Sequence, residues 1–290
     1  MTDYLINVCG DSTNATWLIK GEKNILYEAG MAYSAAAMIQ KIKQELQGAP
    51  LDAIILSHSH YDHVAGLPFV KTEWPDAVVY GSAYAAKILE KPTVRATMRR
   101  LSEDAAKGAG IDHLPEYDED LFKIDVTVKE GDILSIGDHK ITVYETPGHT
   151  KCSVSYLIND DVIMASETIG VFKGEWYMPC YLVGYQMCLD AIEKLRNLPA
   201  KQVFISHMGI QETSHPAELW AFIEKKLIDT KDEIIEIIKA HETEEERLQV
   251  MKAKYHDNVV EESEQPSFAF LLNAAATLKV TERECMEESK

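Results

Sequence analysis

The chain has 290 residues, of which 46% are hydrophobic and 26% are charged, values close to the averages for soluble globular proteins. They exclude collagen-like, low-complexity and disordered chains, and no apolar run approaches the roughly 20 residues that cross a bilayer. The 47 acidic and 29 basic side chains give a formal net charge of −18, which argues against nucleic acid as a partner because phosphates repel an acidic surface.

Two further features bear on the cellular compartment. The N-terminus lacks the basic segment and the long apolar stretch of a secretory signal. The five cysteines are widely spaced and form no CxxC pair. Reduced thiols are the simplest interpretation, so we expect a cytoplasmic protein that does not associate with a membrane.

The first half of the chain alternates strand and helix patterns. Apolar and β-branched runs predict strands, and apolar residues at helical spacing predict helices. The predicted strands cover residues 4–9, 16–27 with a turn at 21–24, 51–56 and 76–80, and the predicted helices cover 32–46, 82–89 and 93–108. This order favours an α/β fold in which helices cover a sheet.

The second half repeats this arrangement. Strands are predicted at 125–129, 140–144, 153–158 and 161–164, followed by a helix at 187–197 and a strand at 202–205. We therefore expect two sheets packed as a sandwich with helices outside. Amphipathic helices are predicted beyond Pro216, at 217–230, 231–241, 244–254 and 267–279. The predicted domains are the sandwich, residues 1–212, and a C-terminal helical extension packed on it, residues 213–290.

Four potential metal ligands lie within six residues, directly after the predicted strand at 51–56. They are His58, His60, Asp62 and His63. The end of a strand fixes the direction of the backbone and leaves side chains free to converge on a metal. One tetrahedral ion cannot easily use all four, so the pattern favours two ions, with His58 and His60 at one and Asp62 and His63 at the other.

Two later histidines also follow strands. His149 comes after the turn residues Pro147 and Gly148, which direct its imidazole out of the loop. His207 follows the apolar strand at 202–205, separated from it by Ser206. Both positions are typical of ligands that join a metal site from a distant part of the chain.

The order His58-x-His60-x-Asp62-His63, then His149, Glu167 and Ser206-His207, resembles the metallo-β-lactamase superfamily over about residues 4–210. The resemblance implies a four-layer αβ/βα sandwich with a dinuclear metal site at one edge of the two sheets. It also implies that His58, His60 and His149 hold the first ion, and that Asp62, His63 and His207 hold the second. The C-terminal helices are similar in layout to the extensions of glyoxalase II and quinolone-signalling thioesterases.

Glu167 departs from the family pattern. The family usually has Asp, preceded by Gly, at the position that bridges both ions, whereas Ser166 precedes Glu167 here. The extra methylene of Glu makes the carboxylate reach further. Three outcomes remain open, in order of preference: Glu167 bridges both ions, binds one ion, or leaves the second site weak.

Coordination of water by two cations lowers its pKa to about 7, and the same cations polarise a carbonyl or phosphoryl oxygen. We therefore expect a dinuclear metal-dependent hydrolase of a small-molecule ester, thioester, lactone or phosphoester, acting by attack of a metal-bound hydroxide. Asp62 is the expected catalytic proton acceptor or donor. The expected cofactors are two divalent ions, zinc first, with iron or manganese as alternatives.

Two other functions remain open. One is a di-iron redox or oxygen-utilising enzyme on the same fold, since an extra carboxylate ligand suits a harder metal. Flavodiiron proteins, however, usually place Glu where this sequence has His60. The other is a metal-containing signalling or binding module, whose acidic surface and C-terminal helices would permit a homodimer.

Four residues are candidates for substrate binding. Arg95 and Arg99 share a helical face and suit a phosphate or carboxylate, although pairing with neighbouring acids is the more ordinary role of such residues. Tyr181 and Tyr185 follow the Glu167 loop and could line an apolar pocket, although core packing explains them about as well.

Overall fold

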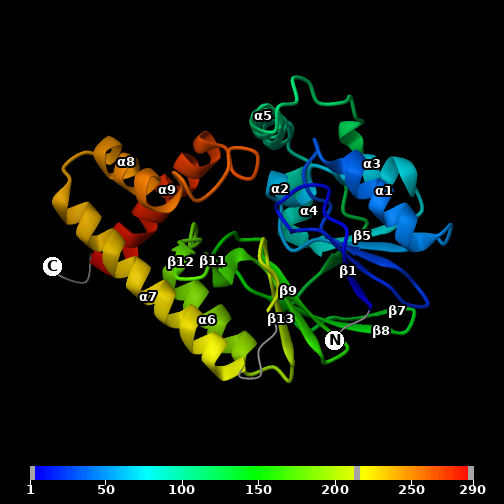
Figure 1. Ribbon diagram of the computed structural model, residues 1–290. Coiled ribbons are helices and arrows are strands. Elements are labelled where there is room, and N and C mark those ends of the chain that lie inside the picture. Colours follow the sequence, from blue (N-terminus) through cyan, green and yellow to red (C-terminus); the bar gives the residue numbers. More distant parts are fainter. Residues whose placement is uncertain (1–3, 212–215, 287–290) are drawn as a thin grey trace.

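Six short strands form the first sheet of the computed structural model, which describes residues 4–211 and 216–286 (Figure 1). The strands lie in chain order: β1 (Leu5–Asn7), β2 (Trp17–Ile19), β3 (Ile25–Tyr27), β4 (Ala53–Ile55), β5 (Val78–Ser82) and β6 (Val126–Val128). The pairs from β1 to β3 are antiparallel, and those from β3 to β6 are parallel. The carboxyl ends of β3 to β6 therefore meet at one edge.

The second sheet also has six strands, in the order β14-β13-β10-β9-β8-β7. They are β7 (Ile133–Ile136), β8 (His139–Glu145), β9 (Val154–Ile158), β10 (Val162–Ala165), β13 (Gln202–Ile205) and β14 (Gly209–Gln211). Only β10 and β13 pair in parallel; the other neighbours are antiparallel. The residues that follow β10 and β13 consequently emerge side by side.

Alternation along the strands creates the core between the sheets. Ile25 and Tyr27 of β3 face the second sheet, whereas Leu26 packs with the helices on the outside. Tyr27 meets Phe204 of β13 edge to face, with ring centroids 5.3 Å apart. Successive side chains of a strand point to opposite faces, so buried strands of this kind carry apolar residues on both sides.

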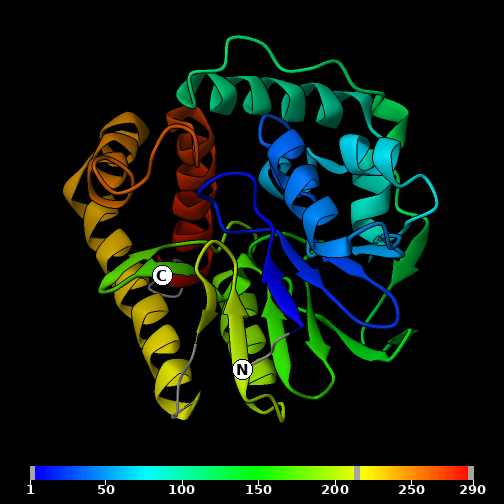
Figure 2. The same ribbon diagram turned by 45° about the vertical axis from the view of Figure 1, so that its right-hand side comes forward.

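Helices cover both outer faces. Against the first sheet lie α1 (Ala35–Leu46), α3 (Leu67–Glu73), α4 (Ala83–Leu89) and α5 (Pro92–Gly108), together with the short α2 (Tyr61–Val64) and η1 (Glu119–Leu121). Against the second lie α6 (Tyr185–Arg196), α7 (Pro216–Ala240), α8 (Glu244–Tyr255) and α9 (Ser267–Thr281), the last continued by η3 (Glu282–Met286). Figure 2 shows these C-terminal helices, yellow to red, on the side opposite to the blue and cyan helices of the first half. None of the described helices combines the length and apolar character that a membrane crossing requires.

The α/β sandwich with C-terminal helices is confirmed, with some differences in its elements. The predicted break between 230 and 231 is wrong, because α7 runs through it. Its buried residues recur every three or four positions from Trp220 through Thr230 to Ile237, so one continuous stripe faces the core. The elements β7, α3, β14 and the hairpin of β11 (Val171–Lys173) and β12 (Trp176–Met178) were not predicted. The predicted domain boundary at 212 lies outside the described residues.

Candidate metal centre

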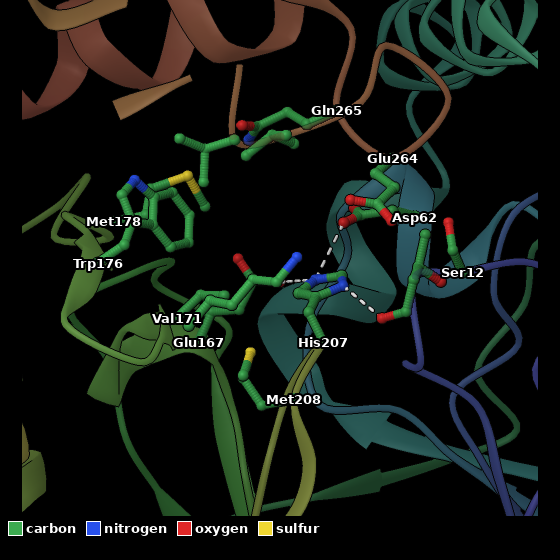
Figure 3. Close-up of a pocket in the computed structure, with 14 residues that line it drawn as sticks. Ser12, Asp62, Glu167, Val171, Trp176, Met178, His207, Met208, Glu264 and Gln265 are labelled. Atoms are coloured by element: carbon green, nitrogen blue, oxygen red, sulfur yellow. Dashed lines mark hydrogen bonds and ion pairs between the residues drawn. The ribbon is translucent and has the colours of Figure 1, made fainter. Parts of the chain in front are cut away.

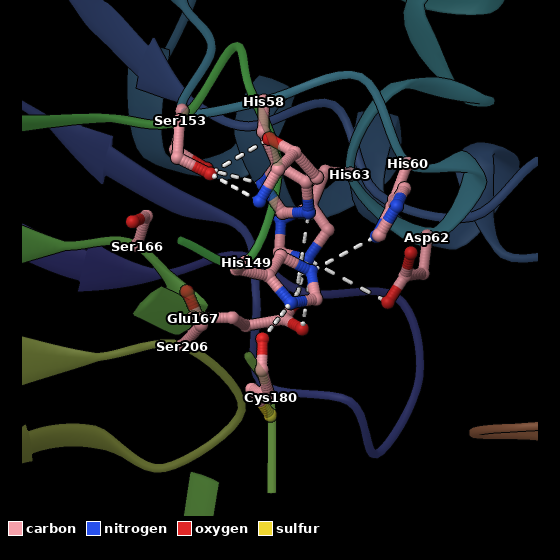
Figure 4. A network of polar contacts seen from close by, with 12 residues as sticks. His58, His60, Asp62, His63, His149, Ser153, Ser166, Glu167, Cys180 and Ser206 are labelled. Carbon is pink, nitrogen blue, oxygen red and sulfur yellow. Dashed lines mark hydrogen bonds and ion pairs between the residues drawn. The ribbon is translucent and has the colours of Figure 1, made fainter. Parts of the chain in front are cut away.

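Seven side chains meet where the strand ends of the two sheets adjoin; Figure 4 labels six of them, and Figure 3 labels the seventh, His207. The first sheet supplies four of them just after β4, and the second supplies three from the segments after β8, β10 and β13. In chain order these are His58, His60, Asp62, His63, His149, Glu167 and His207. The fold therefore brings together all seven residues that the sequence proposed as metal ligands.

Local structure orients several of these side chains. Asp62 and His63 lie in the single turn of α2, and Glu167 begins the 3-10 turn η2 (Glu167–Ile169), whose N-cap is Ser166. His207 adopts a φ of +66°, in the left-handed region that residues other than glycine seldom occupy. This residue turns the chain from β13 into β14 and brings its ring to Glu167, so backbone strain coincides with a potential ligand.

The Glu167 carboxylate lies between two groups of histidines. Its Oε1 is 2.6 Å from His63 Nε2 and 3.0 Å from His207 Nε2. Its Oε2 is 3.1 Å from His149 Nε2. Within the described residues, Glu167 is the one side chain that belongs both to the group with His58, His60 and His149 and to the group with Asp62, His63 and His207.

The first group offers ring nitrogens that lack ordinary partners. His58 Nε2 is buried without a hydrogen-bond partner, and His60 Nδ1 faces His149 Nε2 at 3.0 Å. Buried polar atoms are normally satisfied, so an orphaned nitrogen next to other ring nitrogens is the arrangement that a cation would complete. The donor set thus fits a metal ion.

The second group is richer in carboxylate oxygen. Asp62 Oδ2 is 3.5 Å from both His63 Nε2 and His207 Nε2. The potential ligand atoms of each group lie within 4.8 Å of one another. Mixed imidazole and carboxylate ligands suit zinc, iron and manganese, so the donor set does not select among them.

Contacts behind the histidines fix their rings. Metal-ligating histidines commonly use their second ring nitrogen in this way, which sets ring orientation and tautomer. Three of the contacts are hydrogen bonds: His58 Nδ1 with Ser57 Oγ at 2.8 Å, His149 Nδ1 with Cys180 O at 2.9 Å, and His207 Nδ1 with Thr13 O at 3.0 Å. Among the residues that the structure describes, His63 Nδ1 has no hydrogen-bond partner and lies 3.5 Å from Glu28 Oε1, an ion-pair distance. Sequence reasoning did not identify these four partners.

The two groups differ in charge. Burial, followed by the neighbouring histidines, lowers the pKa of His58 well below its usual value, and burial with His149 lowers the pKa of His60 to about 4. Burial also acts to lower the pKa of His63, but the carboxylates of Asp62 and Glu28 outweigh it and raise the pKa well above normal. Glu167 likewise outweighs burial at His207 and raises its pKa.

Glu167 itself remains ionised. Burial acts to raise the pKa of its carboxyl, but the charge of His149 and the hydrogen bonds from His207 and His63 outweigh it and lower that pKa well below normal. An ionised carboxylate amid imidazoles is suited to bind cations and not to carry protons.

A cavity of about 230 Å³ opens over the second group (Figure 3). Its floor is formed by Asp62, Glu167 and His207. Its walls come from the β11–β12 hairpin, from the connection between β1 and β2, and from the segment between α8 and α9 in the C-terminal helical block. The wall residues include Ser12, Thr13, Lys173, Trp176, Met178, Val259, Val260, Glu264 and Gln265. Ligand sites are typically concave and largely apolar with a few polar groups, as here.

The four candidates for substrate binding do not line this cavity. Arg95 pairs with Asp120 at 3.3 Å, and Arg99 pairs with Glu119 at 3.0 Å. These acids come from a segment that folds back over α5, so the arginine charges are already compensated.

The two tyrosines belong to the core of the C-terminal half. Tyr181 is fully buried, and its hydroxyl contacts Thr281 Oγ1 at 3.0 Å. Tyr185 packs edge to face on Tyr181, with centroids 5.4 Å apart. The two rings join α6 to α9 instead of forming the wall of the cavity.

Comparison with known proteins gives a family model, the metallo-beta-lactamase superfamily, that matches residues 10–207. A probable metallo-hydrolase of Bacillus subtilis, YqgX, is 30% identical over 200 residues, which are 68% of this chain and 84% of that protein. A hydroxyacylglutathione hydrolase of Rhodopseudomonas palustris is 29% identical over 175 residues, 58% of this chain and 51% of that protein.

A third relative is the anaerobic nitric oxide reductase flavorubredoxin of Salmonella typhi, 29% identical over 164 residues, 56% of this chain and 29% of that protein. The chain thus spans about half the length of the hydroxyacylglutathione hydrolase and less than a third of the flavorubredoxin. Among solved structures, an archaeal metallo-beta-lactamase superfamily protein from Sulfolobus tokodaii has a TM-score of 0.60 at 17% identity, covering 97% of this chain and 98% of that chain. That likeness shows the shared fold.

Proposed function

The chain belongs to the metallo-β-lactamase superfamily, and from that premise we propose that it is a dinuclear metal-dependent hydrolase of a small-molecule ester, thioester, lactone or phosphoester. One observation carries the proposal: a single carboxylate, Glu167, contacts members of both histidine groups. Two divalent ions bound there would supply a Lewis acid and lower the pKa of coordinated water to about 7.

The residues of the chain have distinct tasks in this proposal. His58, His60 and His149 would hold the first ion through their ring nitrogens, and Asp62, His63 and His207 would hold the second. Glu167 contacts members of both groups and so fixes their positions relative to each other. Asp62 is half-buried and lines the floor of the cavity, where its carboxylate can accept a proton from a reacting group and return it to the leaving group.

The hydrolase proposal is supported by relatives that are named hydrolases, YqgX and hydroxyacylglutathione hydrolase. The second candidate is a di-iron redox enzyme. It is favoured by the similarity to flavorubredoxin and by the carboxylates of Asp62 and Glu167, which suit iron. His60, which lies in contact with His149, supplies a nitrogen at the position where the flavodiiron resemblance would lead us to expect a carboxylate.

A direct experiment separates the two. Protein loaded with zinc or manganese is offered thioester, lactone and phosphodiester probes, and iron-loaded protein is tested for oxygen consumption with a reductant. We expect hydrolysis that Asp62→Asn removes and that Asp160→Asn, an exposed turn variant, leaves intact. Reductant-dependent oxygen consumption without any hydrolysis would refute the hydrolase and support the redox enzyme.

Further parts of the proposal concern partners. We propose that the protein acts in the cytoplasm on a small molecule, independently of nucleic acid and membranes, and that its C-terminal helices permit a homodimer. Size-exclusion chromatography with light scattering tests the dimer.

A further inference from the structure

The segment at 257–266, which we name the roof segment, joins α8 to α9 and reaches the metal centre from the C-terminal helical block. Four of its residues line the cavity: Val259, Val260, Glu264 and Gln265. The cavity over the metal centre is therefore shaped by a part of the chain that lies outside the residues matched to the family model, 10–207. Family membership says nothing about the chemistry of this wall.

The roof segment is tied to the other half of the molecule. The Tyr33 hydroxyl donates a hydrogen bond to Ser263 O at 3.1 Å. The end of α5 packs so closely that a Cβ on Gly108 would lie 2.6 Å from the carbonyl carbon of Glu262. His256 Nε2 lies 2.7 Å from Gln265 O. These contacts fix the direction in which the side chains of Glu264 and Gln265 leave the segment.

Both side chains present hydrogen-bond acceptors that the protein leaves unmet. Glu264 and Asp62 both line the cavity, and Figure 3 shows them on the same side of it. Glu264 is half-buried, and in the described part of the chain no lysine or arginine pairs with its carboxylate. Gln265 Oε1 is buried and lacks a hydrogen-bond partner. A buried acceptor without a partner, such as Gln265 Oε1, is costly unless a ligand donates to it, and the half-buried Glu264 carboxylate is accessible to the same ligand.

The remaining walls are compatible with a cation. Lys173 is the sole lysine or arginine lining the cavity, and it is exposed on the opposite wall, in the β11–β12 hairpin. Trp176, Met178 and Val260 contribute apolar side chains to the lining. An aromatic ring and an unpaired carboxylate are both favourable neighbours for a positive group.

We propose that the roof segment recognises a substrate group that carries positive charge and N–H donors, an ammonium or guanidinium, and that Glu264 is the specificity-determining residue for it. Identification of this ligand as the substrate rests on the proposed hydrolase function, whereas its binding does not. The substrate class that follows is a cationic ester or thioester whose charged end lies under the roof segment while its reactive carbonyl faces Asp62 and Glu167.

The first arm of the test measures binding alone. Butylguanidinium has donor groups and a fixed charge, and it cannot lose its proton to bind a metal as an amine does. Isothermal titration of metal-loaded protein should show that Glu264→Gln weakens its binding on the order of tenfold, the size of one partly screened charge pair. Glu261→Gln is the matched control, because Glu261 is exposed on the same segment and lies outside the cavity. Metal content and thermal unfolding of both variants confirm intact protein.

The second arm measures hydrolysis of 4-nitrophenyl esters of 4-guanidinobutanoate, hexanoate and glutarate. The wild type should prefer the guanidino ester in kcat/KM, Glu264→Gln should reduce that preference on the order of tenfold, and Glu264→Lys should move it toward glutarate. Equal effects of Glu264→Gln and Glu261→Gln on butylguanidinium binding would overturn the inference. Loss of binding in Glu264→Gln alone, with none of the three esters hydrolysed, would support the cation site and count against the hydrolase.

Discussion

The two halves of the metal centre share Glu167 but differ in electrostatic character. In the half formed by His58, His60 and His149, burial lowers the pKa of His58 well below its usual value and that of His60 to about 4. The half formed by Asp62, His63 and His207 surrounds its histidines with carboxylates, which raise the pKa values of both. One half is ready to accept a cation at neutral pH, and the other must first lose protons.

One fold can therefore make two unequal metal sites from similar ligands. The first half offers imidazole nitrogens besides the shared Glu167, whereas the second adds the carboxylate of Asp62 and opens to the cavity. We therefore expect the first half to fill first and the second to face the substrate.

The largest effect is expected from removing the orphaned nitrogen. His58→Ala should delete the ion of the first half and lower kcat/KM for hydrolysis on the order of a hundredfold to a thousandfold, comparable with the loss of one transition-state donor. Steady-state kinetics and elemental analysis measure the two quantities. His113→Ala, at an exposed histidine outside the centre, is the control and should change neither. Wild-type activity in His58→Ala would show that this half is not used.

The next-largest effect is expected from the residues that contact the second ring nitrogen of a histidine ligand. Ser57→Ala removes the hydroxyl that contacts His58, and Glu28→Gln removes the charge that faces His63. Each change should weaken metal affinity tenfold to a hundredfold in its own half only, since outer contacts of this kind orient the ligand ring. Competition with a chromophoric zinc chelator resolves the two dissociation constants. If either variant weakened the metal affinity of both halves equally, the proposed difference between the halves would be wrong.

A smaller effect concerns the protons that are released when metal binds. In metal-free protein the pKa values of His63 and His207 are raised and those of His58 and His60 are lowered, so at pH 7 the second half holds more protons than the first. Filling the first half should release almost no protons, and filling the second should release up to two. Titration calorimetry in buffers of different ionisation enthalpy counts them. Proton release at the first equivalent of metal would reverse the assignment.

The smallest effect concerns the stability of metal-free protein. The folded pKa of His60 lies below its unfolded value, so its contribution to stability is present above about pH 6.5 and is lost as pH falls toward 4. The raised pKa of His63 has the opposite sign, and its contribution is lost as pH rises through that value. Urea unfolding of metal-free protein at a series of pH values should therefore give a free energy of unfolding that is largest near neutral pH. His60→Gln should reduce the loss of unfolding free energy on the acid side of this maximum and leave the alkaline side unchanged. An unchanged loss on the acid side would contradict the account.

How much of the metal centre can be predicted from the sequence depends on how far apart the interacting residues lie along the chain. The four ligands from His58 to His63 form a local pattern, so their proximity is visible without a structure. The carbonyl groups of Thr13 and Cys180, which contact the rings of His207 and His149, carry no side-chain signal at all. Such contacts arise from tertiary packing, and only the fold reveals them.

The same limit applies to substrate recognition. Arg95 and Arg99 stand out as basic residues in an acidic chain, yet Glu119 and Asp120 return some twenty residues later to neutralise them. Much of the actual cavity wall comes from the β11–β12 hairpin and the roof segment, neither of which has a recognisable motif. The break assigned within α7 failed for a related reason: no Gly or Pro marks Thr230, and its burial in the core depends on packing.

The most direct test of the shared Glu167 is metal content per chain, measured by elemental analysis on native protein, Glu167→Asp and Glu167→Gln. The account predicts two ions in the native chain and a loss of at least one in Glu167→Gln, because one ionised carboxylate serves both halves. A native chain with one ion or none, restored to two by Glu167→Asp, would contradict it and show that the longer side chain weakens the second half.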